Sequence, residues 1–213
     1  RERIDHLLDK GSFREIGLLG VSTRPEDRET TPGDGKITGY ARIASRPVAV
    51  VSNDFTVKGA SSSMTNMRKI AHVKRVATER GFPMVVLGES SGARMPDNMG
   101  ARGMGTRLGN DPTQYIRDRK TPWASAVLGQ CFGSSAWYSC LSDFTVMRKG
   151  AVLAVASHGL ASLAIGQKVD PEDLGGWQLH SDRTGLVDRV VETDAEALDE
   201  IKRFLSYLPS HSN

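Results

Sequence analysis

The sequence contains little cysteine and histidine and has no long run of apolar residues. Its two cysteines, Cys131 and Cys140, are nine residues apart, which excludes a disulfide scaffold and fits no zinc-ligand spacing, so we expect buried thiols in a reducing compartment. No stretch approaches the roughly 20 apolar residues of a membrane span, and no secretory signal is visible. The histidines lie too far apart for ligand spacing and predict no metal site: His6, His72, His158, His180 and His211.

The chain also lacks a large excess of charge and the short motifs of several enzyme classes. Its 28 basic and 25 acidic residues give a net charge of +3, which is too small to indicate nucleic-acid binding by itself. No Gly-x-Ser-x-Gly pentapeptide occurs, which disfavours a serine hydrolase. No Walker loop or Gly-x-Gly-x-x-Gly fingerprint follows the first strands, which disfavours a nucleotide cofactor.

An alternation of strand and helix patterns is present instead, over 213 residues that are ample for a sizeable core. The predicted strands cover 36–44, 47–53, 85–87, 123–128, 144–147, 151–156 and 186–191. The predicted helices cover 4–8, 64–80, 111–119, 159–166 and 195–208. The first two strands flank a short turn and predict a hairpin. Strands separated by helices imply an α/β fold, here built of strand–strand–helix units.

Two of the predicted strands end in small residues, near 90–93 and 129–134. The first run continues as Gly88-Glu-Ser-Ser-Gly-Ala-Arg94, and the second as Gly129-Gln-Cys-Phe-Gly-Ser134. Small side chains let a ligand approach the main-chain N–H groups closely, and two such groups aimed at one point would stabilise an oxyanion. Such a site suits a reaction through the enolate of a thioester. The alternative interpretation is a pair of turns with small residues for packing.

The predicted helix over 64–80 carries a basic face that includes Arg68 and Lys69. Most such faces are solvated surface, whereas one that binds a ligand would suit an anionic tail such as the phosphates of coenzyme A. The Gly- and Met-rich segment 95–110 follows the first small-residue turn and contains Arg102 and Arg107. Its length is plausible for a lid or a substrate-contacting loop.

A series of motifs runs through the chain, each of them weak when taken singly. In order they are Arg1-Glu-Arg-Ile-Asp-His-Leu-Leu-Asp-Lys-Gly-Ser-Phe-Arg-Glu-Ile, Gly33-Asp-Gly-Lys-Ile-Thr-Gly-Tyr, Asn53-Asp-Phe-Thr-Val-Lys-Gly-Ala-Ser, Ser91-Gly-Ala-Arg94, Gly129-Gln-Cys-Phe-Gly133 with Asp143-Phe144, and Asp173-Leu-Gly-Gly176. Their order and spacing are specific. Together they resemble the N-terminal domain of the carboxyltransferase (beta) component of biotin-dependent acyl-CoA carboxylases, of the propionyl-CoA and methylcrotonoyl-CoA type.

This resemblance implies a crotonase-like (ClpP/crotonase) α/β fold and the transfer of a carboxyl group from carboxybiotin to the α-carbon of an acyl-CoA. Gly92 and Ala93 would hold the thioester enolate through their N–H groups. Gly133 and Ser134 would form the second glycine turn. The CoA moiety is assigned to a set of three cations: Arg68, Lys69 and Arg94.

The resemblance also implies that residues 1–213 are only the N-terminal, acyl-CoA-binding half of the carboxyltransferase. The biotin-binding half would come from a homologous C-terminal domain, usually of a partner subunit, so the piece alone is expected to be inactive. Expected partners are acyl-CoA, a biotin carboxylase and biotin carrier subunit, and further copies in a homo-oligomer, with no nucleic acid and no membrane. The expected location is the cytoplasm, or the mitochondrial matrix in a eukaryote.

Several residues depart from the family's usual pattern. Ser91 stands at a glycine position of the first turn, and Gln130, Phe132 and Ser134 replace Pro, Ala and Gly in the second. His158 stands where a proline is usual. These changes leave the identity of the acyl group open.

Three alternatives remain open from the sequence. A decarboxylase subunit would run the reaction in the reverse direction, and a scaffold of the same fold would bind only CoA or a partner subunit. A crotonase-type hydratase would need catalytic glutamates beside the turns, and only Glu89 is close in sequence to either of them. We expect Glu89 to be a structural hydrogen-bonding group.

Overall fold

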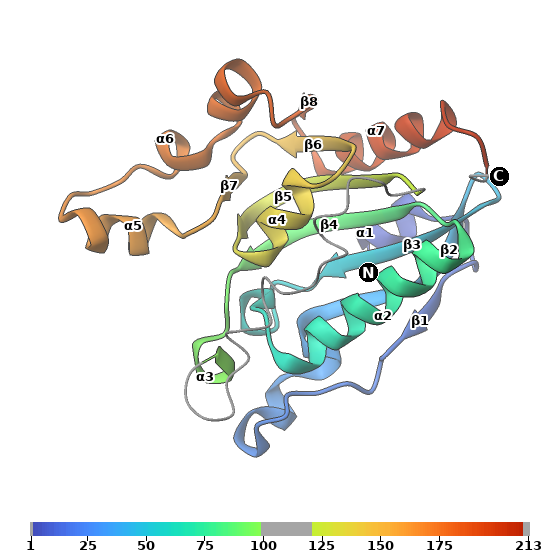
Figure 1. Ribbon diagram of the computed structural model, residues 1–213, viewed down its shortest axis with the longest axis horizontal. Helices are drawn as coiled ribbons and strands as arrows, with labels where there is room; N and C mark the ends of the chain where they lie inside the picture. Colours follow the sequence, from blue (N-terminus) through green and yellow to red (C-terminus); the bar gives the residue numbers. More distant parts are fainter. Residues whose placement is uncertain (1, 99–120, 211–213) are drawn as a thin grey trace.

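The computed structural model describes residues 2–98 and 121–210, and its centre is a sheet between two layers of helices (Figure 1). The strands are β1 (Arg14–Ile16), β2 (Lys36–Ile43), β3 (Arg46–Asn53), β4 (Met84–Ser91), β5 (Trp123–Phe132), β6 (Phe144–Arg148), β7 (Val152–Ala154) and β8 (Arg189–Val191). The helices are α1 (Glu2–Leu7), α2 (Met64–Arg80), α3 (Met95–Asn98), α4 (Ser134–Cys140), α5 (His158–Ile165), α6 (Pro171–Gly175) and α7 (Asp194–Ser206).

The sheet has the order β1-β2-β3-β4-β5-β6-β8, and β7 pairs with the far end of β5. β1, β2 and β3 are antiparallel neighbours, whereas β3, β4, β5, β6 and β8 are parallel. β4 and β5 are buried on both faces along most of their length, which explains their continuous apolar runs. Because parallel strands end at the same edge of a sheet, the segments that follow β4 and β5 are delivered to one place.

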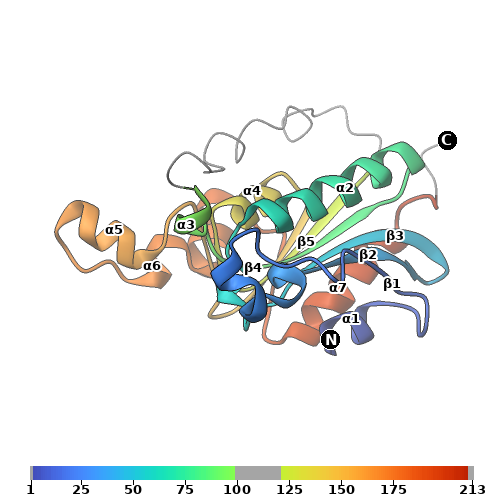
Figure 2. The same cartoon turned by 90° about the horizontal axis from the view of Figure 1, so that it is seen from below.

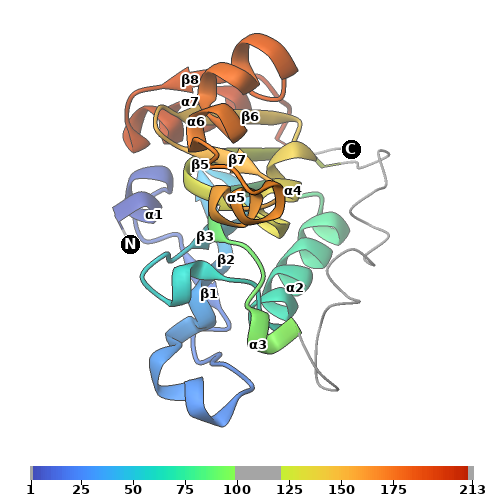
Figure 3. The same ribbon diagram turned by 90° about the vertical axis from the view of Figure 1, so that its left-hand side faces the viewer.

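Helices cover the two faces of the sheet (Figure 2). α2 and α4 lie on one face, and α1 and α7 lie on the other; in Figure 3, α1 and α2 stand on opposite sides of β2 and β3. α2 begins at a capping box formed by Ser63 and Asn66 and ends at Gly81 in the left-handed conformation. On the opposite face, α7 packs Leu198 and Ile201 into the core. Among the described residues, no helix combines the length and the apolarity that crossing a membrane requires.

The main elements agree with the sequence predictions, and the boundaries differ at strand ends. The hairpin of β2 and β3 and the helix over 64–80 are confirmed. β5 extends to Phe132, beyond the predicted end at Leu128, because its last residues pair with both β4 and β7. β8 is shorter than predicted. Most of the segment 95–110, with Arg102 and Arg107, and the helix predicted over 111–119 lie outside the described residues.

α5 and the segment around it project from the sheet beyond β7 (Figure 1). No residue of α5 is buried, although the helix is mostly apolar. Leu160, Leu163 and Ile165 are all exposed, Leu163 by 82%. An exposed cluster of this kind is typical of a surface that another protein segment covers.

The packing of α7 predicts a large and local stability effect. Ile201→Ala removes a fully buried side chain from the α1 and α7 face, so we expect the free energy of unfolding to fall by about 2–5 kcal/mol. The matched control Leu19→Ala, at a side chain that is 90% exposed, should change it by less than about 0.5 kcal/mol. Urea titrations of the protein measure both values, and equal effects of the two substitutions would contradict this packing.

Candidate functional site

The two small-residue turns come together at the ends of β4 and β5. Ser91 and Phe132 are paired in the register of these strands, and the turns follow directly. A Cβ atom added to Gly133 would lie only 3.2 Å from Gly92 Cα and 3.8 Å from Ala93 N. Gly133 itself has φ 62° and ψ −127°, a conformation that other residues rarely adopt. The structure therefore places the predicted residues of the two turns side by side.

Ser62 joins the two turns from a third segment of the chain. Its main-chain N–H donates to the Gly92 carbonyl over 2.8 Å, and its own carbonyl accepts from the Arg94 N–H over 2.9 Å. The Ser62 hydroxyl also lies 2.7 Å from the Ser134 hydroxyl, in a hydrogen bond between the two oxygens. Since Ser62 contacts both turns, it fixes their distance from each other.

The N–H groups of these turns differ in what they bind. The Gly92 N–H donates to Ser90 Oγ over 3.1 Å, and the Gly133 N–H donates to the Val155 carbonyl over 3.2 Å. Within residues 2–98 and 121–210, the N–H groups of Ala93 and Ser134 have no hydrogen-bond partner. Of the two donors predicted for the first turn, the Gly92 N–H thus has an acceptor within the protein.

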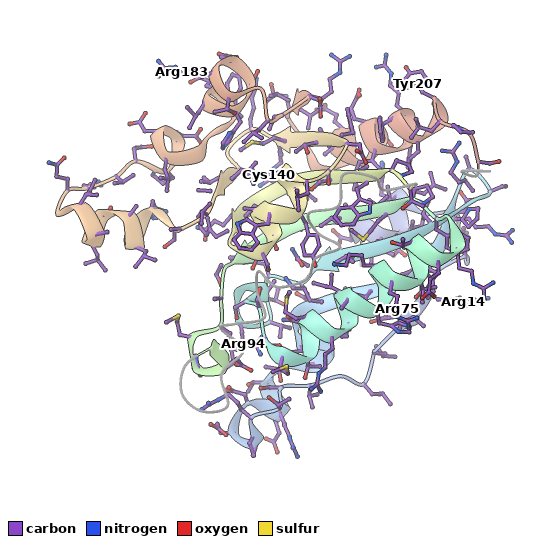
Figure 4. All side chains as sticks on the ribbon, viewed as in Figure 1. Arg14, Arg75, Arg94, Cys140, Arg183 and Tyr207 are labelled. Carbon is purple, nitrogen blue, oxygen red and sulfur yellow. The ribbon has the colours of Figure 1, made fainter. Side chains whose placement is uncertain are left out.

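Arg94, predicted to contact CoA, is buried, and Figure 4 labels it between α3 and the start of α2. Its guanidinium lies 2.6 Å from the Asp34 carboxylate and also donates to the hydroxyl of Ser61 over 3.1 Å and to its carbonyl over 3.2 Å. Asp34 is completely buried and also accepts a short hydrogen bond from Ser63. Arg94 thus supports the turn, since a buried carboxylate requires a charged partner.

Lys69 is also not available as a CoA ligand. Its ammonium is buried and donates to the Gly33 carbonyl over 2.7 Å and to the Lys36 carbonyl. Burial lowers the pKa of this lysine. The segment that carries these carbonyls folds over α2, so Lys69 holds that segment in place. Arg68, the third predicted cation, remains exposed on α2.

A groove of about 440 Å³ adjoins the first turn, and the sequence reasoning missed most of it. Ser91, Ala93 and the buried Arg94 line it together with two further cationic side chains, Arg24 and Lys58. Both cations contact Asp27, at 3.5 Å and 2.9 Å, and the hydrogen bond from Lys58 lowers the pKa of this carboxyl. Lys58 belongs to one of the sequence motifs, which was the available signal, whereas Arg24 lies in a segment predicted only as an exposed connection.

The other residues that the sequence analysis singled out are Glu89, His158 and Phe132. Glu89 points to the opposite face of the sheet, where its carboxylate pairs with Arg3 of α1 at 2.5 Å, so the expectation of a structural role is met. His158 begins α5, which Ser157 caps. Phe132 is buried behind Gly92, where it restricts the space beside the first turn.

The cysteines match the sequence prediction only in part. Cys131 is buried in β5, and burial raises the pKa of its thiol to about 12. Cys140 is exposed at the end of α4, so the expectation of two buried thiols is wrong there. In the part of the chain that the structure describes, no three side chains of histidine, cysteine, aspartate or glutamate come together as a metal site would require.

Comparison with known proteins matches residues 1–213 to the family of the carboxyl transferase domain. The chain is 32% identical to the propionyl-CoA carboxylase, carboxyltransferase subunit of Haloferax mediterranei, and covers 42% of that protein. It is 33% identical to the human propionyl-CoA carboxylase beta chain, mitochondrial, and covers 40% of it. All of the present chain takes part in both matches, so it spans about two fifths of the length of these curated relatives.

Solved structures agree with this match. Transcarboxylase 12S, solved with methylmalonyl-CoA and methylmalonic acid bound, has a TM-score of 0.86 at 29% identity over 99% of this chain and 42% of that chain. The beta subunit of P. aeruginosa geranyl-CoA carboxylase has a TM-score of 0.81 at 27% identity over 98% of this chain and 39% of that chain. These neighbours have the crotonase fold, which confirms the predicted fold. The chain belongs to the carboxyl transferase domain family.

Proposed function

We propose that this chain is the acyl-CoA-binding half of a biotin-dependent acyl-CoA carboxyltransferase. The observation that carries the proposal is the pair of N–H groups without partners, at Ala93 and Ser134, one on each of two adjoining turns. Ala93 is exposed, so its N–H can bind a ligand or water, and Ser134 begins α4, where the first N–H groups have no acceptor within the helix. Ala93 lines a groove, which favours a catalytic site over a scaffold, because binding alone does not need a polarised carbonyl group.

The chemistry follows from where these donors lie. A thioester carbonyl oxygen placed between Ala93 and Ser134 would accept a hydrogen bond from each turn. These bonds strengthen as negative charge develops on the oxygen, so they favour the enolate over the ground state. Carboxybiotin, when bound, would supply the carboxyl group, and the biotin left behind would take up the α-proton that enolate formation releases. The chain's own contribution is to hold and polarise the thioester, and losing one such donor typically costs about 3 kcal/mol.

The groove beside Ala93 is the proposed route for the CoA moiety. It continues from the first turn along Ser91 to Arg24 and Lys58, whose donors could contact an anionic group at the rim. This assignment replaces Lys69 and Arg94, which are committed within the fold. Arg68 stays in the proposed set as an exposed cation of α2.

The proposed assembly is larger than this chain. The relatives extend well beyond the matched part, which leaves room for a C-terminal, biotin-binding half and for contacts with a biotin carboxylase and biotin carrier subunit. The transcarboxylase 12S structure is described as a hexamer, and we propose a homo-oligomer here. The exposed apolar residues of α5 support such a partner surface. The proposed location is the cytoplasm, or the mitochondrial matrix in a eukaryote.

Removing one donor tests the proposed site. Ala93→Pro deletes an N–H that has no partner in the described structure, so no internal hydrogen bond is lost. In the full-length protein with its biotin-carrying partner, we expect carboxylation of an acyl-CoA panel to fall by about 10²–10³-fold in kcat. The matched control Ala93→Gly keeps the N–H and should stay within about tenfold of the unmodified protein. Unchanged turnover in the proline variant would refute the role of Ala93.

The close approach of the turns gives a second test. Gly133→Ala places a methyl group 3.2 Å from Gly92 Cα and forces the turns apart, so we expect kcat to fall by about 10²-fold. Gly150→Ala is the control, because Gly150 also has a positive φ but has nothing within 4 Å of an added Cβ. Both variants carry backbone strain, but only Gly133→Ala should lower kcat in steady-state assays. Equal losses in both would show that strain, and not the distance between the turns, matters.

A further inference from the structure

Lys36 is a buried cation that the proposed chemistry does not use directly. It is the first residue of β2, and only 1% of it is exposed to solvent. Its ammonium donates to the Ala60 carbonyl over 2.8 Å. Burying a lysine without a hydrogen-bond partner is costly, and the Ala60 carbonyl is the partner that the Lys36 ammonium has here.

The acceptor is part of a chain of hydrogen bonds that leads to the first turn. The Ala60 carbonyl also accepts from the Ser90 hydroxyl over 3.0 Å. Ser90 Oγ in turn accepts the Gly92 N–H over 3.1 Å. Ser90 and Ala60 are themselves completely buried, so water does not compete for these bonds. Lys36 is thereby connected through two hydrogen-bonded groups to the residue that precedes Ala93.

The acceptor also lies in strained backbone. Lys58, Gly59 and Ala60 have φ values of 49°, 59° and 48°, so three consecutive residues are left-handed and two of them are not glycine. Each left-handed residue other than glycine costs roughly 1–2 kcal/mol. Such a turn persists only when its surroundings fix it, and the bonds from Lys36 and Ser90 to the Ala60 carbonyl do so.

The groups that face Lys36 come from several elements. Asp34 and Arg94 form their buried ion pair nearby, Lys69 approaches from α2, and Cys131 approaches from β5. Burial dominates over these charges and lowers the pKa of Lys36 to about 7. Cys131 stays a neutral thiol at that pH, since burial raises its pKa to about 12. A charged ammonium donates a stronger hydrogen bond than a neutral amine does.

We propose that Lys36 is a positioning residue for the proposed carboxyl transfer, which fixes the left-handed turn at 58–60 against Ser90 and thereby sets the orientation of the Ala93 N–H. The inference rests on the proposed function only for its kinetic consequence. The structural coupling from Lys36 to Ala93 holds whatever the substrate is. The protonated form holds the turn more firmly, so the N–H is best placed below the pKa of the lysine.

The kinetic test compares Lys36→Met with the unmodified full-length protein in its complex with the biotin-carrying partner. We expect kcat to fall by at least about tenfold, because the donor is displaced. KM for acyl-CoA should rise by a smaller factor, because the turn at 58–60 also carries Lys58 of the groove. In the unmodified protein, kcat should decrease as the pH rises through about 7, where the ammonium becomes neutral. The ratio of the two kcat values should show this inflection, since the methionine variant cannot titrate there.

Lys74→Met is the matched control, because it also removes a buried ammonium, here one that lies over the Tyr138 ring, but does not touch Ala60 or Lys36. It should lower stability and keep both kcat, within about threefold, and the pH inflection. A Lys36→Met protein with the kcat and pH profile of the unmodified protein would overturn the proposal. So would an equal loss of kcat in the two variants, which would indicate a general effect of a destabilised core.

A second measurement needs neither turnover nor a folded variant. In full-length protein labelled with ¹³C at alanine methyl groups, the Ala60 and Ala93 signals should shift together with a midpoint near pH 7, the pKa of Lys36. Ala41, in the core of the opposite face, should not shift with them. An Ala93 signal that stays constant while Ala60 titrates overturns the coupling. If no acyl-CoA is carboxylated but both methyl groups titrate together, the proposed function fails and the positioning of Ala93 by Lys36 stands.

Discussion

The close approach of Gly133 to Gly92 is the constraint on which the site depends. Two parallel neighbours, β4 and β5, end at the same edge of the sheet, and their turns can touch only because neither residue carries a side chain. Ser62 then holds both turns through three hydrogen bonds. In this arrangement the turns that carry the Ala93 and Ser134 N–H groups lie side by side before any ligand binds.

Buried cations supply the rigidity behind this edge of the sheet. Arg94 pairs with Asp34, Lys69 binds the carbonyls of the segment that folds over α2, and Lys36 binds Ala60. All three side chains are buried, so each acts through the parts of the fold that it holds in place. A site that works through main-chain donors needs such support, since a main-chain N–H moves with the backbone that carries it.

The sequence predicted the features that local patterns encode. The hairpin of β2 and β3, the helix α2 and the two small-residue turns follow from periodicity, capping and composition, and the resemblance in motif order led to the correct family and fold. It could not show that Ser90 Oγ engages the Gly92 N–H, because that depends on a side-chain rotamer. Nor could it show that Lys69 and Arg94 are buried, because the segment that covers them has no periodic signal and packs through long-range contacts.

The infrared carbonyl stretch of an acyl-CoA labelled with ¹³C at its thioester carbon reports most directly on donation from Ala93 and Ser134. Hydrogen bonds from two fixed N–H groups polarise the carbonyl and lower its stretching frequency. Bound to the full-length protein, the labelled thioester should therefore absorb at a lower frequency than it does free in water, and Ala93→Pro should remove much of that shift. A bound thioester that absorbs at the same frequency as in water would contradict the assignment of these N–H groups.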